Sequence, residues 1–319
     1  MTGNFKFFFI ALFLGLPFWW GANLLEKNLN DVFYWQEISR NQKVFAAQIA
    51  LEEQLRGLKP FRNREVNDLL IQAKSAVSVL LDDKGREKFL FAKETDQQLP
   101  IASLTKLMTA LVVTEYYNLE NEVRVSKEAI GQEGDFGKLE AGQIFPVEYL
   151  LYPLLMESSN DAAFSLADDY EGMDERKFVE LMKWEAEKLG MHNTFFDNPT
   201  GLDPEESGTR MNYSTASDLT KLIKEILKKP LILEILQTQR YSLYGPDLIN
   251  SNELLGGITG IIGGKTGYTG EAGGCMILVT EAPQNQGYLV NVILGANGTQ
   301  DRFREMKKLV DWVEIAYKW

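Results

Sequence analysis

The chain has 319 residues and a formal net charge of -12, and 45% of its residues are hydrophobic, as is ordinary for a folded protein. The negative charge argues against a nucleic-acid partner, because phosphate binding needs a positive surface. One cysteine, Cys275, and one histidine, His192, exclude an internal disulfide and a Cys/His zinc site, and disfavour a Ser-His-Asp triad. These counts do not exclude a carboxylate metal site, but we predict no metal and no cofactor. We interpret Cys275 as a buried strand thiol and His192 as a turn residue.

The N-terminal residues 1–25 predict a membrane segment. Residues 7–25 carry no formal charge, and this length is close to the roughly 20 residues needed to cross a bilayer. The amino terminus and Lys6 precede the segment, and Glu26, Lys27 and Asp31 follow it, a weak charge bias that favours a cytoplasmic N-terminus with the rest of the chain outside. No small-residue cleavage site follows, and Trp19-Trp20 resembles an interfacial belt. We therefore expect a retained anchor rather than a cleaved signal peptide.

Residues 26–72 are charged and aromatic, with a partly helical apolar spacing that ends near Pro60, and predict a helical stalk or lead-in. The folded domain is expected to cover residues 73–319. It opens with a predicted hairpin, in which the apolar run 76–81 and the run 88–91 flank a turn at 82–85.

A helix is predicted after Pro100, starting at Ser103, because apolar residues follow at i, i+3 and i+4 spacing. The remaining pattern predicts helices, then late strands, then a closing amphipathic helix. Strands at both ends with helices between them indicate an α/β sheet domain with an inserted helical lobe. The predicted helices are 146–169, 174–189, 215–227 and 302–317, and the late strands are 276–280 and 288–294.

The first of three short motifs is Ser103-Leu104-Thr105-Lys106. Residues three apart share a helix face, so Ser103 and Lys106 can approach each other, and a helix N-terminus favours negative charge beside Ser103. A lysine can take a proton from a serine only when it is neutral, and burial or a second cation lowers its pKa. Alone, such a motif more often marks an ordinary helix start with a solvated lysine.

The second motif, Ser158-Ser159-Asn160, places a hydroxyl and an amide at the start of a helix, for a proton relay and a contact to a substrate amide. The plainer interpretation is a helix N-cap, which the same residue types favour.

The third motif is Lys265-Thr266-Gly267. A phosphate-binding P-loop would need glycine where this chain has Thr259, and a helix after the lysine, whereas residues 267–270 are typical of a turn. We therefore predict a strand edge ending in a turn, with Lys265 as a second cation in the cleft and a docking point for a substrate carboxylate.

Together, the motifs are typical of penicillin-binding proteins and serine β-lactamases. With the sequence around them, they resemble the D-alanyl-D-alanine carboxypeptidases, which are low-molecular-mass penicillin-binding proteins. The resemblance covers roughly residues 73–319 and implies an antiparallel sheet flanked by helices with an inserted helical lobe, as in the β-lactamase/transpeptidase-like fold. The stretches that carry it are 100–109, 157–163, 195–202 and 264–269.

By this resemblance, Ser103 forms an acyl-enzyme, Lys106 accepts its proton and Ser158 relays protons toward the leaving group. The backbone N–H groups of Ser103 and Tyr268 form the oxyanion hole, and Arg302 assists Lys265 with the terminal carboxylate of a peptidoglycan stem peptide. β-Lactams are the expected inhibitors, and the place of action is the outer side of a bacterial cell membrane. The implied substrate-binding residues are Asn160, Lys265, Thr266, Gly267, Tyr268 and Arg302.

Two departures from the family pattern are visible. Ser159 stands where relatives often carry glycine, which leaves the contacting residues unchanged. The sequence also ends soon after the closing helix, without the extra β-domain and C-terminal anchor common in the family, so the N-terminal segment is expected to replace that anchor.

Two alternatives stay open. A class A β-lactamase shares the three motifs, but no convincing loop with a glutamate that activates water lies between Asn160 and Lys265. A catalytically silent, membrane-tethered module of the same fold would bind cell-wall peptide without cleaving it, and the intact Ser103, Lys106, Ser158 and Lys265 argue against it.

Overall fold

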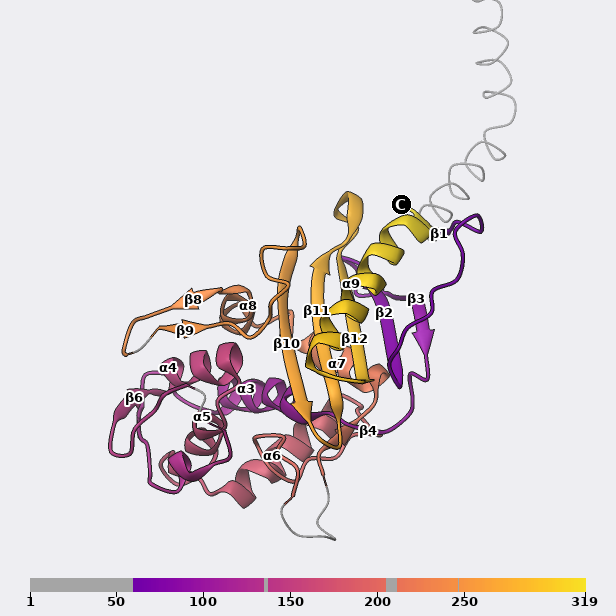
Figure 1. The fold of residues 1–319 in the computed structure, drawn as a ribbon. Helices are drawn as coiled ribbons and strands as arrows, with labels where there is room; N and C mark the ends of the chain where they lie inside the picture. The colour runs from indigo at the N-terminus through magenta and orange to yellow at the C-terminus, as the bar shows by residue number, and fades with distance from the viewer. Residues whose placement is uncertain (1–59, 135–136, 205–210, 246) are drawn as a thin grey trace, which may run out of the picture. The chain divides into compact units, whose positions relative to one another are not determined.

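The computed structural model describes residues 60–134, 137–204, 211–245 and 247–319 (Figure 1). The predicted membrane segment and most of the predicted lead-in lie outside these residues. In the part of the chain that is described, no helix combines the length and the apolar character that a bilayer crossing requires. Residues Arg62–Tyr317, together with Trp319, form one compact unit.

The centre of this unit is a five-stranded antiparallel sheet in the order β10-β11-β12-β2-β3. The predicted hairpin and late strands are confirmed. The predicted turn at 267–270 is wrong in position, because Gly267 still pairs with Cys275 and Thr269 with Gly273, so the turn begins at Gly270. The strands are β2 (Ser75–Leu81), β3 (Glu87–Lys93), β10 (Ile261–Thr269), β11 (Gly273–Glu281) and β12 (Tyr288–Ala296).

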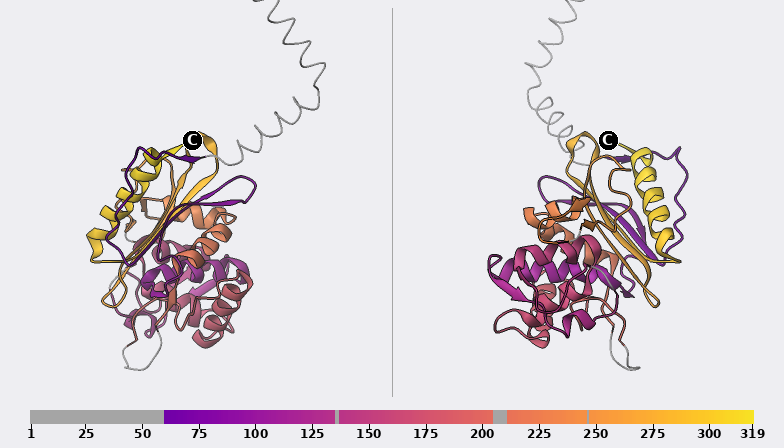
Figure 2. Two further views of the ribbon diagram at one scale, coloured as in Figure 1. Left: turned by 90° about the vertical axis from the view of Figure 1, so that its right-hand side faces the viewer. Right: turned by 60° about the vertical axis from the view of Figure 1, so that its left-hand side comes forward.

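Both faces of the sheet are covered, as Figure 2 shows. Side chains alternate along each strand, so Val77 and Val79 of β2 enter one core and Ala76 and Leu80 enter the other. The closing helix α9 (Thr299–Ala316) packs on β11 and β12, while α7 (Ala216–Ile226) packs on β12 and β2 from the opposite face. The predicted fold, an antiparallel sheet flanked by helices with a helical lobe, is confirmed.

Helix α3 (Thr105–Tyr116) lies inside the helical lobe, and every residue from Thr105 to Val113 is buried. A helix that is surrounded on all sides is central rather than amphipathic, which explains why its apolar residues are not confined to one stripe. The other helical segments of the lobe are α4 (Val147–Tyr152), η3 (Pro153–Glu157), α5 (Asn160–Phe164), η4 (Ser165–Asp169) and α6 (Glu175–Lys188). Of these segments, η3 and α6 contact α3.

The predicted continuous helix over 146–169 is interrupted at Ser158. This residue has a left-handed backbone, with φ of 68°, and ends η3. Ser159 then caps α5, because its hydroxyl accepts a hydrogen bond from the Ala162 amide at 3.1 Å. The interruption turns Ser158 out of the helical path and toward the sheet edge at β10.

The remaining elements are short. The longest of them is the helix α8, which the sequence analysis did not predict. They are β1 (Phe61–Arg62), β4 (Leu99–Pro100), η1 (Ala102–Leu104), β5 (Glu122–Arg124), η2 (Ala129–Gly131), β6 (Ile144–Pro146), β7 (Tyr213–Ser214), α8 (Pro230–Gln237), β8 (Arg240–Tyr241), β9 (Leu248–Ile249), η5 (Pro283–Asn285) and β13 (Tyr317–Lys318).

Candidate active site

Ser103, the predicted helix start, lies in η1, two residues before α3 begins at Thr105, and is half-buried. No side chain caps the start of α3, so the helix N-terminus beside Ser103 keeps its positive electrostatic character. Ala102, with φ of 47°, reverses the backbone immediately before the serine. The local fold therefore presents the Ser103 hydroxyl at a helix start that favours developing negative charge.

Lys106 is fully buried beneath Ser103, and burial lowers its pKa to about 7. Its Nζ lies 2.6 Å from both Asn160 Oδ1 and the Thr200 carbonyl oxygen, and 3.2 Å from Ser103 Oγ. The two short contacts are to carbonyl oxygens, which can only accept. A neutral amine has two N–H donors and one lone pair, so its lone pair is left for the Ser103 hydroxyl.

Lys265 on β10 forms a second lysine–serine pair, because its Nζ donates to Ser158 Oγ at 2.9 Å and to the Thr266 carbonyl at 2.9 Å. It is also almost completely buried. Burial, with the nearby charges of Lys106 and Arg302, holds the pKa of Lys265 well below its usual value. The site thus contains two buried lysines, each in contact with a serine hydroxyl.

Asn160 supports Lys106 from the first turn of α5. Its Oδ1 accepts from Lys106, and its Nδ2 donates to the Glu133 carbonyl at 2.6 Å. One of the two Nδ2 hydrogens is left for another acceptor. Asn160 therefore fixes the lysine while keeping the capacity to hydrogen-bond a ligand.

The sheet edge approaches Ser103 at Gly267 of β10. A Cβ atom at this glycine would lie 3.1 Å from the Ser103 amide nitrogen, so glycine permits the close contact of strand and helix start. Thr266 Oγ1 lies 2.8 Å from Ser251 Oγ, while the side chain of the next strand residue, Tyr268, is 48% exposed. Arg302 of α9 donates from Nη1 to the Gly267 carbonyl at 2.8 Å.

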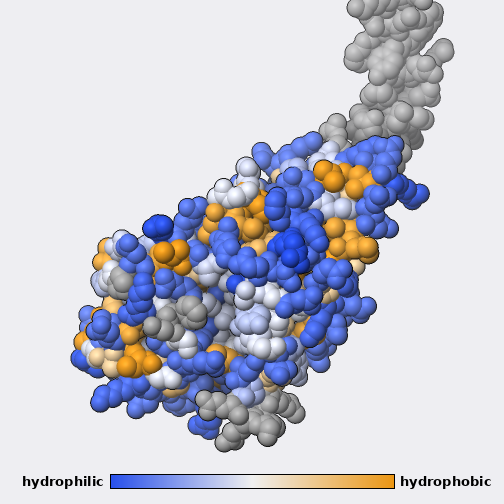
Figure 3. Space-filling view, in the orientation of Figure 1, coloured by the Kyte–Doolittle hydropathy of each residue, from blue (hydrophilic) through white to orange (hydrophobic). Residues whose placement is uncertain are grey.

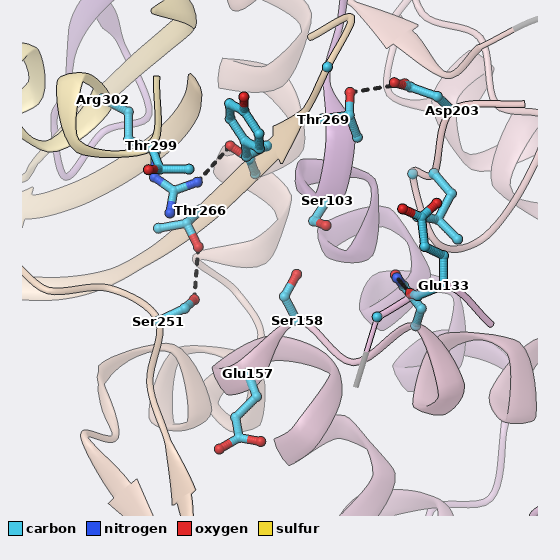
Figure 4. Close-up of a pocket in the computed structure, with 17 residues that line it drawn as sticks. Ser103, Glu133, Glu157, Ser158, Asp203, Ser251, Thr266, Thr269, Thr299 and Arg302 are labelled. Atoms are coloured by element: carbon cyan, nitrogen blue, oxygen red, sulfur yellow. Dashed lines mark hydrogen bonds between the residues drawn. The ribbon is translucent and has the colours of Figure 1, made fainter. Parts of the chain in front are cut away.

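Most of these residues line a cleft of about 470 Å³, and the buried Lys106 and Lys265 each contact one of its serines. Figure 4 shows Ser103 and Ser158 in the middle of the cleft, with Thr266, Thr299 and Arg302 on one side. The structure brings all the sequence-predicted site residues to this one place. On the face drawn in Figure 3, the surface is mainly hydrophilic, with scattered hydrophobic patches.

Several residues of the site escaped the sequence analysis. The carbonyls of Thr200 and Glu133 take part through backbone atoms, which residue type does not reveal, although Thr200 lies in a stretch that carried the family resemblance. Ser251 reaches Thr266 from a distant segment. The other unpredicted lining residues include Glu157, Asp203 and Thr299.

The two residues to which no chemistry was assigned lie elsewhere. His192 is in an exposed turn, and Cys275 is buried in β11, where burial raises the pKa of its thiol to about 11. Across the described ranges, no group of three His, Cys, Asp or Glu side chains is arranged to hold a metal ion.

Gly201 closes the floor of the site. Its φ is +83°, and a Cβ atom there would lie 2.1 Å from the Ala102 carbonyl oxygen, immediately before Ser103. We expect Gly201→Ala to reduce the free energy of unfolding by about 3 kcal/mol, because a backbone clash adds to the left-handed strain. Gly142→Ala is the matched control, since Gly142 has φ of +89° but open space around its Cβ position. It should cost only about 1–2 kcal/mol. Equal losses in urea unfolding would contradict the close packing at Gly201.

The chain is similar to known proteins in both sequence and structure. A family model described as D-alanyl-D-alanine carboxypeptidase matches residues 63–298. The chain therefore belongs to the D-alanyl-D-alanine carboxypeptidase family of serine peptidases.

The relatives within this family include proteins named as a carboxypeptidase, an endopeptidase and a penicillin-binding protein. The chain is 32% identical to the D-alanyl-D-alanine carboxypeptidase DacF of Bacillus subtilis, over 80% of this chain and 65% of that protein. It is 34% identical to a D-alanyl-D-alanine endopeptidase of Pseudomonas aeruginosa, over 77% of this chain and 79% of that one. Among solved structures, the cefotaxime-bound penicillin-binding protein D2 of Listeria monocytogenes aligns with a TM-score of 0.65 at 30% identity, covering 78% of this chain and all of that one.

Proposed function

We propose that this chain is a serine D-alanyl-D-alanine carboxypeptidase that removes the terminal D-alanine of peptidoglycan stem peptides through an acyl-enzyme. The observation that carries this proposal is the placement of Lys106 Nζ, buried, held by two carbonyl acceptors and 3.2 Å from the Ser103 hydroxyl. This arrangement supplies a neutral base to a serine without any histidine. The family and the β-lactam-bound relative support the same substrate class.

In the first half of the reaction, Ser103 Oγ attacks the carbonyl carbon of the penultimate D-alanine while Lys106 takes the hydroxyl proton. The backbone N–H groups of Ser103 and Tyr268 stabilise the oxyanion that forms. When the C–N bond breaks, the proton that Lys106 accepted passes through the Ser158 hydroxyl, which contacts Lys265, to the leaving amine, and Lys106 is neutral again. Free D-alanine departs and an ester on Ser103 remains.

In the second half, water attacks the ester carbon and Lys106 accepts a proton from it. As the bond to Ser103 Oγ breaks, Lys106 returns this proton to Oγ, which regenerates the serine hydroxyl and releases the peptide acid. Thr266 and Arg302 lie on one side of the cleft, and Lys265 precedes Thr266 on β10. These three residues would bind the terminal carboxylate of the substrate, for which the Arg302 guanidinium supplies a positive charge. Asn160 would bind a substrate amide through its second Nδ2 hydrogen.

Two assays on the purified protein test this function. Incubation with a peptide ending in D-alanyl-D-alanine should release D-alanine, and fluorescent penicillin should label the protein covalently and block that release. Labelling without D-alanine release would favour a transpeptidase or the silent module. Rapid turnover of the penicillin would favour a β-lactamase.

The pH dependence of acylation follows from Lys106, whose pKa is about 7. The base is active when neutral, so the acylation rate should rise about tenfold per pH unit below pH 7 and level off above it. Stopped-flow measurement with a chromogenic cephalosporin between pH 5.5 and 8.5 tests this. A rate that stays constant from pH 5.5 to 8.5 would rule out Lys106 as the titrating base.

For the rest of the chain, we propose that residues 1–25 anchor the protein as a single span, that residues 26–72 form a lead-in, and that the domain over 73–319 works outside the cell membrane. The uncharged run at 7–25 supports the anchor. Full-length protein should sediment with membranes and resist extraction by carbonate, whereas a variant that starts at residue 27 should remain in the supernatant. Full-length protein that carbonate extracts would oppose the anchor.

A further inference from the structure

Glu157 lies immediately before Ser158, lines the cleft, and has no role in the chemistry proposed above. Its two carboxylate oxygens accept hydrogen bonds from two different chain segments. Oε2 accepts from the Gly137 amide at 3.0 Å, and Oε1 accepts from the Ile249 amide of β9 at 2.8 Å. Figure 4 shows the carboxylate directed away from Ser103, so it is not placed to act on the reacting atoms.

The two segments that Glu157 joins each lead to a part of the site. The chain before Gly137 includes Glu133, whose carbonyl holds Asn160. Two residues after Ile249, Ser251 donates its amide to the Met156 carbonyl at 2.8 Å and its hydroxyl contacts Thr266. The carboxylate thus links the support of Asn160 with the wall that carries Thr266.

Ser158 itself needs such support. A left-handed backbone is strained for a non-glycine residue and persists only where neighbouring contacts fix it. On the C-terminal side of Ser158, Ser159 is fixed by two hydrogen bonds. Its amide N–H donates to the Pro153 carbonyl, and its hydroxyl caps α5. On the N-terminal side of Ser158, the Glu157 carboxylate is held by the Gly137 and Ile249 amides. A carboxylate can accept a hydrogen bond at each of its two oxygens, which no other side chain of this length can do.

We propose that Glu157 is a positioning residue that sets the place of the Ser158 hydroxyl against Lys265 and the Thr266 wall. This inference rests on the proposed function, because it assigns Ser158 to the acylation step. A glutamine at this position keeps the size of the side chain but has one acceptor oxygen, and its NH₂ group would face one of the two amides. Misplacement of a catalytic group by about 1 Å can lower a rate by about 100-fold.

The test compares Glu157→Gln and Glu157→Ala with Glu148→Gln, a matched control at an exposed glutamate of α4 in the same lobe. In Glu157→Gln, we expect kcat for D-alanine release, and the acylation rate with penicillin, to fall about tenfold, with KM within twofold of wild type. Amide hydrogen exchange at Gly137 or Ile249 should accelerate. The control should match wild type in all of these. Glu157→Gln keeps the test valid if the alanine variant does not fold.

A purely structural role for Glu157 would lower the thermal midpoint and the active fraction but leave the acylation rate constant of the folded enzyme unchanged, and that result would overturn the inference. So would unchanged exchange at both amides. Wild-type protein is assayed alongside. If wild type neither releases D-alanine nor takes up penicillin, the proposed function fails and the inference falls with it, whereas an active wild type with an unchanged Glu157→Gln rate removes the inference alone.

Discussion

Ser103→Ala should abolish covalent labelling by fluorescent penicillin and reduce D-alanine release by a factor of about 10⁴ or more, as expected for loss of a nucleophile. The physical reason is that the Ser103 hydroxyl lies against Lys106 Nζ at a helix start, and no acyl ester can form without its oxygen. Gel fluorescence and a D-amino-acid oxidase assay measure the two effects.

The matched control for this change is Ser242→Ala, at an exposed serine of the β8–β9 connection. It should leave labelling and D-alanine release at wild-type levels. Ser103 is half-buried, and within the described part of the chain its hydroxyl makes one hydrogen bond, with Lys106. The alanine variant should therefore keep the wild-type thermal midpoint within a few degrees. Labelling that survives in folded Ser103→Ala would refute the assignment of the nucleophile.

Lys106→Met should slow acylation by about 1,000-fold, within the range that removal of a general base produces. Methionine is similar in length but has no amine, so the Ser103 proton loses its acceptor. The Asn160 and Thr200 oxygens also lose a donor, and each unpaired buried group costs about 1–3 kcal/mol. The thermal midpoint should therefore fall as well.

Rate and stability are separated by measuring acylation well below the unfolding temperature. Lys307→Met, at an exposed lysine of α9, serves as the control and should change neither the acylation rate nor the thermal midpoint. Penicillin should still label Lys106→Met slowly, because its nucleophile is intact. An acylation rate within tenfold of wild type would show that another group takes the proton.

Much of the fold was predictable from the sequence, because strand and helix patterns there are strong. The β2–β3 hairpin, β11, β12 and α9 all appear where apolar periodicity indicated them. Helix α8 was missed, although it starts at Pro230, because its apolar run is too short to separate a helix from a buried strand by periodicity.

The interruption at Ser158 shows why the site was harder to predict than the fold. The residues from Pro146 to Asp169 have a continuous helical pattern, and the left-handed serine that interrupts it depends on tertiary contacts such as that with Lys265. Two interpretations of this motif that were weighed as alternatives turn out to be compatible. Ser159 is the N-cap, and this leaves Ser158 and Asn160 to face the cleft.

The pKa of Lys106 is a second property of the site that the sequence could not predict. The spacing of Ser103 and Lys106 predicted their approach, but the low pKa of Lys106 depends on complete burial, which comes from packing against the Thr200 and Asn160 segments. The link from Glu157 to Gly137 and Ile249 is likewise made to backbone amides, so the identity of the partner residues carries no signal of it.

The central claim is that Ser103, rather than the nearby Ser158, carries the acyl group. The most direct test is to trap the acyl-enzyme with penicillin, digest it with protease, and locate the added mass by tandem mass spectrometry. The account predicts a single adduct on Ser103 in wild type and none in Ser103→Ala. An adduct on Ser158, or one on any residue in folded Ser103→Ala, would contradict it.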